Sequence, residues 1–296
     1  MALAKRIFLF LAVNILVIST ITLILNILNI KPYLTAKGID YPSLMIFCFI
    51  WGMGGAFISL ALSKTMAKWM MGVRILDESN SNGLVQTVHE LCRQANMTYM
   101  PEVGIYQSPE PNAFATGSSQ KRSLIAVSSG LLQKMSTQEL EGVLSHEIAH
   151  IVNGDMVTMT LIQGVVNAFV MFLARALAFV FSSQGKNRNV SSYGSYTLFV
   201  FLFQFVFMIL GSVVVAWFSR YREFRADAGG AHIGGKEKMI AALEALKRNQ
   251  GIRDPLHASP AFESMKISSS KKGGWLRFFS SHPPLDERIQ KLKNTL

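Results

Sequence analysis

Residues His146-Glu147-Ile148-Ala149-His150 form the stretch from which the rest of the chain can be interpreted. Side chains four residues apart lie on the same face of an α-helix, so His146 and His150 can direct two imidazoles at one zinc ion. Glu147, the next residue after His146, can reach a water molecule at that ion. The same five-residue pattern also arises by chance, and its surroundings therefore decide what it means.

The residues before this stretch favour a helix. Ser136 and Glu139 have the spacing of a capping box, in which the two side chains bond each other's backbone amides. The chain has only 6 histidines, and two of them occur here at ligand spacing. Apolar residues follow with a mainly helical period. They are Leu140, Val143, Leu144, Ile148 and Ile151.

The composition is that of an integral membrane protein with a sizeable water-facing part. Hydrophobic residues make up 50% of the 296 residues and charged residues only 16%, against about 25% in soluble domains. The net charge of +11 is attributed to membrane topology and anionic headgroups. We expect no nucleic-acid partner, because no nucleic-acid-binding motif accompanies the charge. The 2 cysteines offer no disulfide framework, which fits a reducing compartment.

Four apolar runs are long enough to cross a bilayer core, which takes about 20 residues. They cover residues 7–30, 44–62, 156–181 and 198–217. The first is too long for a signal peptide and is interpreted as an uncleaved anchor. The last two could instead form a buried hairpin inside a large soluble domain. Their length and near lack of charge favour spanning, although Arg175 interrupts the third run.

The distribution of Lys and Arg predicts the orientation of the four spans. Eight of these residues flank the spans on one side and four on the other, which places both termini and both water-facing segments in the cytoplasm. The domain organisation expected is two spans in 1–63, the first part of a cytoplasmic domain in 64–155, a membrane hairpin in 156–217 and the second part of the domain in 218–296.

The water-facing segments predict a mostly helical α+β domain with a small β-sheet. Residues 83–96 and 236–248 have amphipathic helical patterns, and a terminal helix follows residue 281. Residues 102–106 alternate like a short strand, and 123–127 form a second one.

A catalytic zinc normally takes a third protein ligand and keeps one open position. Glu223 is favoured, because it lies at the start of a helical segment and the membrane hairpin returns the chain to the region that His150 left. Asp227 follows it by one helical turn and could accept a hydrogen bond from the non-ligating nitrogen of His146 or His150. Taken alone, Glu223 could also be an exposed charge among three arginines. The other candidates are the carboxylates, His89, His232, His257 and His282.

This arrangement predicts zinc-assisted peptide hydrolysis, with Glu147 as the general base that activates a zinc-bound water. His282 and Arg288 are candidates for substrate or oxyanion contacts, with a helix cap and a surface charge as the equally weighted alternatives. Asn112 precedes a segment that could be the sheet edge to which a peptide adds as a strand. Its side chain either bonds substrate backbone or fixes a turn.

Several motifs together closely resemble the HtpX-type membrane zinc metalloproteases, relatives of the CaaX prenyl endoprotease. They are His-Glu-Ile-Ala-His followed by Asn153-Gly154-Asp155, Glu223-Phe224-Arg225-Ala226-Asp227, Asn112-Ala113-Phe114-Ala115, and His282-Pro283-Pro284 with Arg288. The resemblance covers nearly the whole chain. It implies a gluzincin-like fold, one zinc ion per chain and Glu223 as the third ligand. It also implies a bacterial inner-membrane location and cleavage of misfolded or damaged membrane proteins under envelope and heat stress, with other membrane quality-control proteases as candidate partners.

Two rival functions remain at this point. A protease that cuts within the bilayer would carry its zinc motif inside an apolar span, but Glu139 and Glu141 precede the motif, which favours a site at the cytoplasmic mouth of a span. A non-proteolytic zinc-binding scaffold or holdase would need no general base. The presence of Glu147 therefore favours an enzyme.

Overall fold

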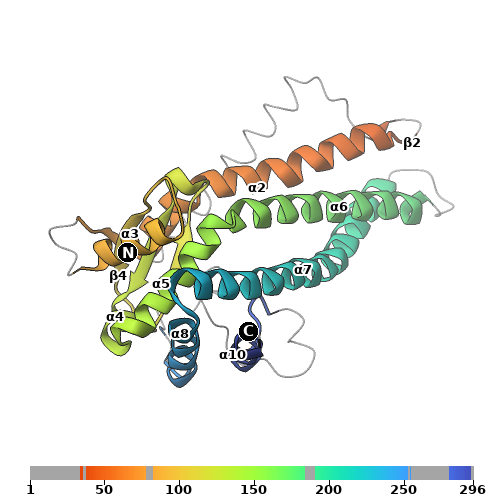
Figure 1. The fold of residues 1–296 in the computed structure, drawn as a ribbon. Helices are drawn as coiled ribbons and strands as arrows, with labels where there is room; N and C mark the ends of the chain where they lie inside the picture. Colours follow the sequence, from red (N-terminus) through yellow and green to blue (C-terminus); the bar gives the residue numbers. More distant parts are fainter. Residues whose placement is uncertain are drawn as a thin grey trace. The chain divides into compact units, whose positions relative to one another are not determined.

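The computed structural model describes residues 34–35, 38–77, 83–183, 191–252, 254 and 280–294. The chain divides into two compact units. We call Met1–Ser59 with Thr160–Val215 the helical unit, and Leu60–Met159 with Ala216–Leu296 the mixed unit. Three long helices each contribute to both units: α2 (Tyr41–Met71), α6 (Asp155–Ser183) and α7 (Ser191–Gly234), which Figure 1 traces along the chain.

These three helices are long and apolar enough to cross a membrane. They contain three of the four expected spans, residues 44–62, 156–181 and 198–217. The expected first span, 7–30, lies outside the described residues. In the helical unit, α2 and α6 approach closely at Gly52, where an added Cβ would lie 2.6 Å from the backbone nitrogen of Ala168. The absence of a side chain at Gly52 therefore permits the close approach of the two helices.

The charge within α6 has local partners. Arg175 donates a hydrogen bond to the carbonyl of Met171 at 3.2 Å, and its guanidinium lies 5.7 Å from the centre of the Phe47 ring on α2. Contacts of this kind lower the cost of a cation among apolar helices.

One expectation about α7 is wrong. The sequence predicts that Glu223 lies at the start of a helix after the fourth span, but α7 continues without a break from Ser191 to Gly234. The physical reason is local, because residues 218–228 contain neither Gly nor Pro and are compatible with a helix throughout. The helix that carries the fourth apolar run therefore also carries Glu223 and Asp227.

A four-stranded sheet forms one layer of the mixed unit, in the order β3-β4-β6-β5. Strand β3 (Arg74–Ile75) pairs antiparallel with β4 (Glu102–Tyr106), which runs parallel to β6 (Leu124–Ser128). The edge strand β5 (Ala113–Thr116) pairs antiparallel with β6, with Ala113 opposite Val127. A single 3₁₀ turn, η2 (Gln120–Arg122), joins β5 to β6. A separate two-stranded ladder pairs β1 (Leu34–Thr35) with β2 (Gly38–Ile39).

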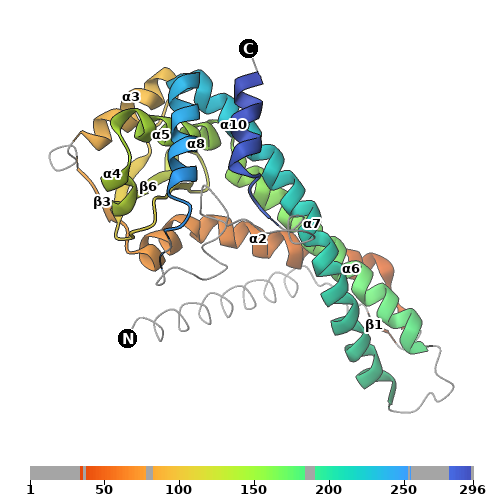
Figure 2. The ribbon, with the colours of Figure 1, turned by 90° about the horizontal axis from the view of Figure 1, so that it is seen from below.

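The mixed unit contains α5 (Thr137–Val152), the helix predicted around residue 146, together with four other helices among its described residues. The others are α3 (Leu84–Gln94), α4 (Ser129–Lys134), α8 (Lys236–Arg248) and α10 (Leu285–Asn294). Figure 2 shows α8 between α5 and α10. Helix α8 contacts both of these helices. The core includes Leu144 and Ile148 of α5, Ile125 and Val127 of β6 and Leu243 of α8, all with no exposed surface.

The start of α5 is fixed by the expected capping box. The Ser136 hydroxyl accepts a hydrogen bond from the amide of Glu139, and the Glu139 carboxylate accepts one from the amide of Ser136. Such a cap stabilises a helix by about 1 kcal/mol. It also sets where α5 begins, and hence which of its side chains face inward.

Candidate metal centre

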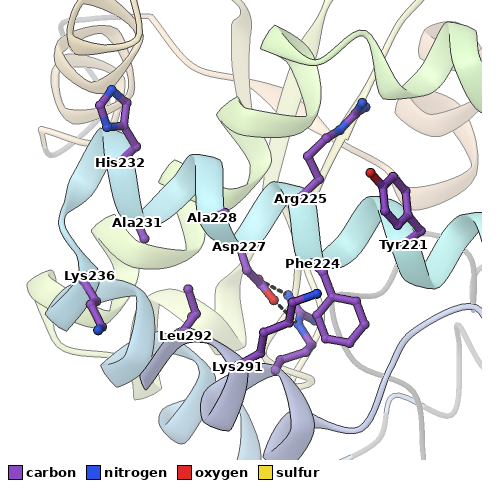
Figure 3. A pocket seen from close by; sticks show the side chains of 11 residues that line it. Tyr221, Phe224, Arg225, Asp227, Ala228, Ala231, His232, Lys236, Lys291 and Leu292 are labelled. Atoms are coloured by element: carbon purple, nitrogen blue, oxygen red, sulfur yellow. Dashed lines mark hydrogen bonds and ion pairs between the residues drawn. The ribbon is translucent and has the colours of Figure 1, made fainter. Parts of the chain in front are cut away.

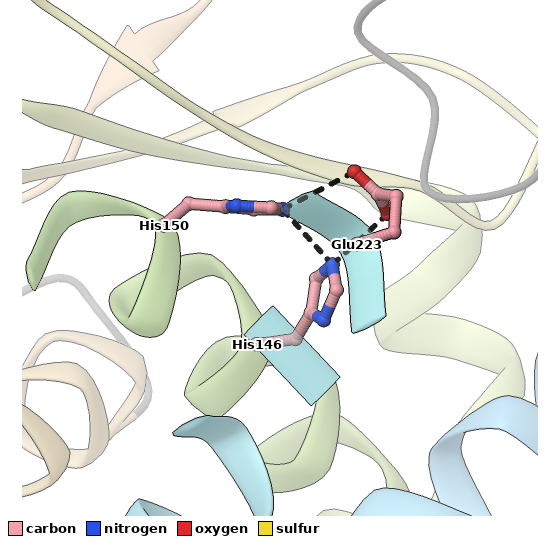
Figure 4. Close-up of side chains that lie close together, drawn as sticks. All are labelled: His146, His150 and Glu223. Carbon is pink, nitrogen blue, oxygen red and sulfur yellow. Dashed lines mark hydrogen bonds and ion pairs between the residues drawn. The ribbon is translucent and has the colours of Figure 1, made fainter. Parts of the chain in front are cut away.

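Three side chains from two helices converge in the mixed unit, as Figure 4 shows. His146 and His150 lie one turn apart on α5, and Glu223 comes from α7. The two Nε2 atoms are 3.1 Å apart, and the Glu223 carboxylate oxygens lie 3.4 Å from that of His146 and 3.5 Å from that of His150. Tetrahedral ligands about 2.0–2.1 Å from a zinc ion lie roughly 3.3 Å apart, so these three donors fit one ion.

Close packing of α7 on α5 brings Glu223 to the two histidines. A Cβ added at Gly230 would lie 3.0 Å from the backbone nitrogen of His146, so a larger residue there would force the two helices apart. Ala226, between Glu223 and Gly230, has no exposed surface. Small residues such as Ala226 and Gly230 indicate a helix face that packs closely on another helix. The sequence-based choice of Glu223 as third ligand did not use this signal.

Glu223 is fully buried, which excludes the interpretation of an exposed charge among arginines. Burial raises the pKa of its carboxyl, but the neighbouring His282, His146 and His150 outweigh burial and hold the pKa well below its usual value. Arg222 donates a hydrogen bond to one carboxylate oxygen at 2.8 Å. The other oxygen, Oε2, is buried without a hydrogen bond from any described residue. A buried acceptor of this kind, facing two imidazoles, suits a cation.

His146 is held from behind by Asp227. Its Nδ1 lies 3.0 Å from Asp227 Oδ1, an arrangement that leaves Nε2 directed at the triad. Burial lowers the pKa of His146, but Asp227 and Glu223 outweigh burial and raise it to about 9. A metal ion at the triad therefore has to displace a proton when it binds.

Arg288 of α10 in turn fixes Asp227. Its Nε donates to Asp227 Oδ2 at 2.8 Å, and a terminal nitrogen donates to Oδ1 at 2.6 Å. Burial raises the pKa of Asp227, but the charge of Arg288 and these two bonds outweigh burial and lower it to about 2. Arg288 has no exposed surface. The alternative interpretation of Arg288 as a surface charge is therefore wrong.

His150 has a carboxylate partner that the sequence interpretation missed. Its Nδ1 lies 2.6 Å from Oδ2 of Asp155, and Asp155 is fully buried at the first residue of α6. The other oxygen of Asp155 accepts a hydrogen bond from Arg225 of α7. Asp155 follows His150 by five residues, directly after Gly154, and this proximity to the motif was the available signal.

His282 lies beside the triad, while Glu147 occupies the expected place on α5. His282 Nδ1 is 3.1 Å from Glu223 Oε2, and the side chain is only 4% exposed. Glu147 is also 4% exposed. Burial lowers the pKa of Arg288, but the charges of Asp227, Glu223 and Glu147 outweigh burial and raise it.

Asn112 lies just before the edge strand β5. Its side-chain amide donates to the Tyr106 hydroxyl at 3.0 Å, and its backbone amide donates to Ser128 Oγ at 3.0 Å. These bonds fix the turn that leads into β5. Of the remaining histidine candidates within the described residues, His89 lies on α3 and His232 is exposed on α7, so neither joins the triad. His257 lies outside the described residues.

Comparisons with known proteins agree with this geometry. The profile of Peptidase family M48 matches residues 78–296. A Protease HtpX homolog of Methylacidiphilum infernorum is 48% identical over 297 residues, and one of Bacillus subtilis is 49% identical over 301, with at least 98% of each chain covered. Protease HtpX of Thioalkalivibrio sulfidiphilus is 45% identical over 98% of both chains.

A likeness to a solved structure extends to the fold. The crystal structure of S. mikatae Ste24p matches with a TM-score of 0.63 at 18% identity, covering 98% of this chain and 64% of that one. The three apolar helices, the buried His-His-Glu cluster and the named relatives all indicate the same class of protein, a membrane metalloprotease. The chain belongs to peptidase family M48, within which it is a membrane metalloprotease of the HtpX type.

Proposed function

We propose that the chain is a zinc-dependent endopeptidase of the bacterial inner membrane that cleaves misfolded or damaged membrane proteins during envelope and heat stress. The observation that carries the proposal is the buried triad of His146, His150 and Glu223 with Glu147 one residue from the first ligand. Two imidazoles and one carboxylate are a typical catalytic zinc set, because they leave a coordination position open.

The first step of the mechanism is the positioning of the ligands. His146, His150 and Glu223 would hold the ion, Asp227 and Asp155 would orient the two imidazoles, and Arg288 would hold Asp227. When bound, zinc supplies Lewis-acid polarisation of the scissile carbonyl and makes water acidic near neutral pH.

Proton transfer is assigned to Glu147. Its carboxylate takes a proton from the attacking water and delivers it to the nitrogen of the leaving amine. His282, whose Nδ1 lies 3.1 Å from Glu223 Oε2, would donate a hydrogen bond to the developing negative charge on the carbonyl oxygen. Arg288 is better suited to positioning than to contact with substrate, because both of its bonds to Asp227 are made and it is fully buried.

Substrate binding is assigned to β5. Among the described residues this strand is the edge of the sheet next to β6. An extended peptide could pair with its outer side and gain main-chain hydrogen bonds without a defined sequence. Asn112 would keep the entrance to β5 in place through Tyr106. Such recognition suits an enzyme whose substrates share an unfolded segment rather than a motif.

The proposed orientation places the mixed unit in the cytoplasm, in accordance with the excess of Lys and Arg on one side of the spans. Membrane-protein substrates and the lipid bilayer would be its partners, and other quality-control proteases could act alongside it. A segment that a damaged membrane protein exposes at the cytoplasmic surface would then reach the site.

The test compares the wild-type protein, Glu147→Gln and the control Glu90→Gln, which changes an exposed carboxylate on α3. All three are reconstituted with zinc and an unfolded membrane-protein substrate. We expect cleavage by wild type and by Glu90→Gln, and a loss of at least a hundredfold in Glu147→Gln with its zinc retained. Equal cleavage by Glu147→Gln would reject the mechanism. Zinc binding without cleavage by any of the three would favour the scaffold or holdase.

A further inference from the structure

A cavity of about 620 Å³ lies in the mixed unit, among α7, the start of α8 and α10 (Figure 3). The cations of its described lining have partners within that unit. Arg288 and Arg225 bond carboxylates. Lys236 donates to a backbone carbonyl, and Lys291 lies over the ring of Phe224. The charges of this cavity are therefore paired, whereas a polar group of the helical unit lacks such partners.

This group consists of two amide side chains near the middle of the third apolar run, on α6. Gln163 and Asn167 lie close to the centre of residues 156–181. They are one helical turn apart and therefore share a face of the helix. Gln163 Nε2 donates a hydrogen bond to Asn167 Oδ1 at 2.9 Å. We call these two side chains the amide pair.

The amide pair is open on its outer side. Gln163 is exposed and Asn167 is partly exposed. Each amide offers two N–H donors and one oxygen acceptor, and the bond between them occupies one donor and one oxygen. Among the residues that the structure describes, no other group bonds the Gln163 oxygen or the Asn167 nitrogen. One face of α6 therefore presents both a hydrogen-bond donor and an acceptor.

The amide pair lies apart from the apolar stripe that α6 exposes. Leu161, Val165 and Phe169 recur every four residues and are 40%, 41% and 64% exposed. Successive residues turn by about 100° around an α-helix, so Gln163 lies about 160° away from Leu161. The apolar stripe suits lipid chains. The amide pair does not, because an amide in hydrocarbon is unfavourable without a hydrogen-bond partner.

A polar side chain of another membrane-embedded segment is the kind of partner that satisfies the amide pair. Within a bilayer, Asn, Gln, Ser and Thr side chains form hydrogen bonds between helices. Each of these side chains carries both a donor and an acceptor, as the amide pair does. The pair is uncharged, which favours such neutral partners over Lys, Arg, Asp or Glu.

We propose that the amide pair binds transmembrane segments of substrate proteins that carry an unpaired Asn, Gln, Ser or Thr side chain. In an assembled membrane protein such side chains bond neighbouring helices, and in a misfolded or unassembled one they are exposed. The amide pair would thus distinguish a damaged substrate from an intact one. The inference rests on the proposed function, because that proposal supplies membrane proteins as substrates.

The experiment measures binding rather than cleavage, so that it does not depend on proteolysis. The full chain carrying Glu147→Gln, here called the parent protein, is labelled with a donor fluorophore and reconstituted in liposomes with an acceptor-labelled single-span peptide. Two peptides are compared, a Leu/Ala span with one central Asn and the same span with Leu in its place. The apparent affinity is obtained from energy transfer as the ratio of peptide to lipid is raised.

Three variants of the parent protein are compared with it. Gln163→Leu/Asn167→Leu removes both amides. The exchange variant, Gln163→Asn/Asn167→Gln, retains two amides on the same face. The matched control is Ser212→Ala, which removes an exposed polar side chain of the fourth apolar run, whose hydroxyl is bonded to the carbonyl of Ile209 at 2.7 Å.

We expect the parent protein to bind the Asn peptide about three- to tenfold more tightly than the Leu peptide, as for a hydrogen bond between helices in a membrane. This preference should be lost in Gln163→Leu/Asn167→Leu and retained in Ser212→Ala. It should also be retained in the exchange variant, which separates the loss of the amides from a change in the packing of α6.

Four outcomes would overturn the proposal. Equal binding of the two peptides by the parent protein would mean that the chain does not distinguish polar spans. A preference that persists in Gln163→Leu/Asn167→Leu, or an equal loss in Ser212→Ala, would place the contact elsewhere. If Gln163→Leu/Asn167→Leu lost only self-association, measured by energy transfer between labelled copies, the partner would be a second copy of the chain. Because the parent protein carries Glu147→Gln, failure of the proposed protease mechanism can be told apart from failure of this site.

Discussion

Each histidine of the triad is oriented by a carboxylate that is itself paired with an arginine, and we call each such chain of three side chains a relay. The two relays lie in different environments. His146 is bonded to Asp227, which Arg288 holds by two hydrogen bonds, and both members of that pair are buried. His150 is bonded to Asp155, which is also buried, but the side chain of its partner Arg225 is 45% exposed. The two arginines should therefore not matter equally, because an exposed arginine is solvated without its carboxylate and a buried one is not.

The largest expected effect is that of Arg288→Met, which keeps an unbranched stem and removes the charge. Asp227 and Glu223 would lose their buried cation, and breaking a buried pair costs about 3–5 kcal/mol. The thermal unfolding midpoint in detergent, read by circular dichroism, should fall sharply. The control Arg248→Met removes an arginine whose side chain is 60% exposed and paired with Glu139, and it should change the midpoint little. A similar midpoint for the two variants would contradict the assigned burial.

The next effect separates stability from metal binding. Asp227→Asn and Asp155→Asn should each lower zinc affinity about 10–100-fold, because each removes the carboxylate that orients a ligand imidazole. Only Asp227→Asn should also destabilise the fold strongly, since it leaves the buried Arg288 charge unpaired. Competitive titration against a chelating dye measures the affinity, and thermal unfolding without metal measures the stability. Equal destabilisation by both variants would remove the distinction between the relays.

The smallest effect is expected for Arg225→Gln. Because its side chain is 45% exposed, the loss should lower zinc affinity by no more than a few fold. The effect should shrink further between low and high salt, since partly exposed charges are screened. Chelator titrations at 0.05 M and 0.5 M NaCl provide the measurement. A loss as large as that of Asp155→Asn, at both salt concentrations, would mean that Asp155 depends on Arg225 for its position.

Local patterns of the sequence were sufficient for much of the fold. The capping box at Ser136, strand β4 at Glu102–Tyr106 and helix α8 at Lys236–Arg248 all occur where the periodicity places them. Each depends on residues close in the chain. The two imidazoles of the triad follow from a four-residue spacing on one helix, which is also a local property.

The relays could not be obtained in the same way. Arg288 and Asp227 are 61 residues apart, and Arg225 and Asp155 are 70 apart. From the sequence alone, each arginine could pair with any of several carboxylates, because the packing of the helices decides which one is its neighbour. The continuity of α7 was missed for another reason, because the fall in hydropathy after Trp217 suggested a boundary although no residue there breaks a helix.

The central claim is that the helix of the fourth apolar run delivers the third ligand. It is tested most directly by the zinc content of the purified protein after gel filtration, measured by inductively coupled plasma mass spectrometry. We predict one zinc ion per chain in wild type and in Arg222→Gln, which removes the neighbour of the carboxylate, and near zero in Glu223→Ala. Full zinc content in Glu223→Ala would contradict the account.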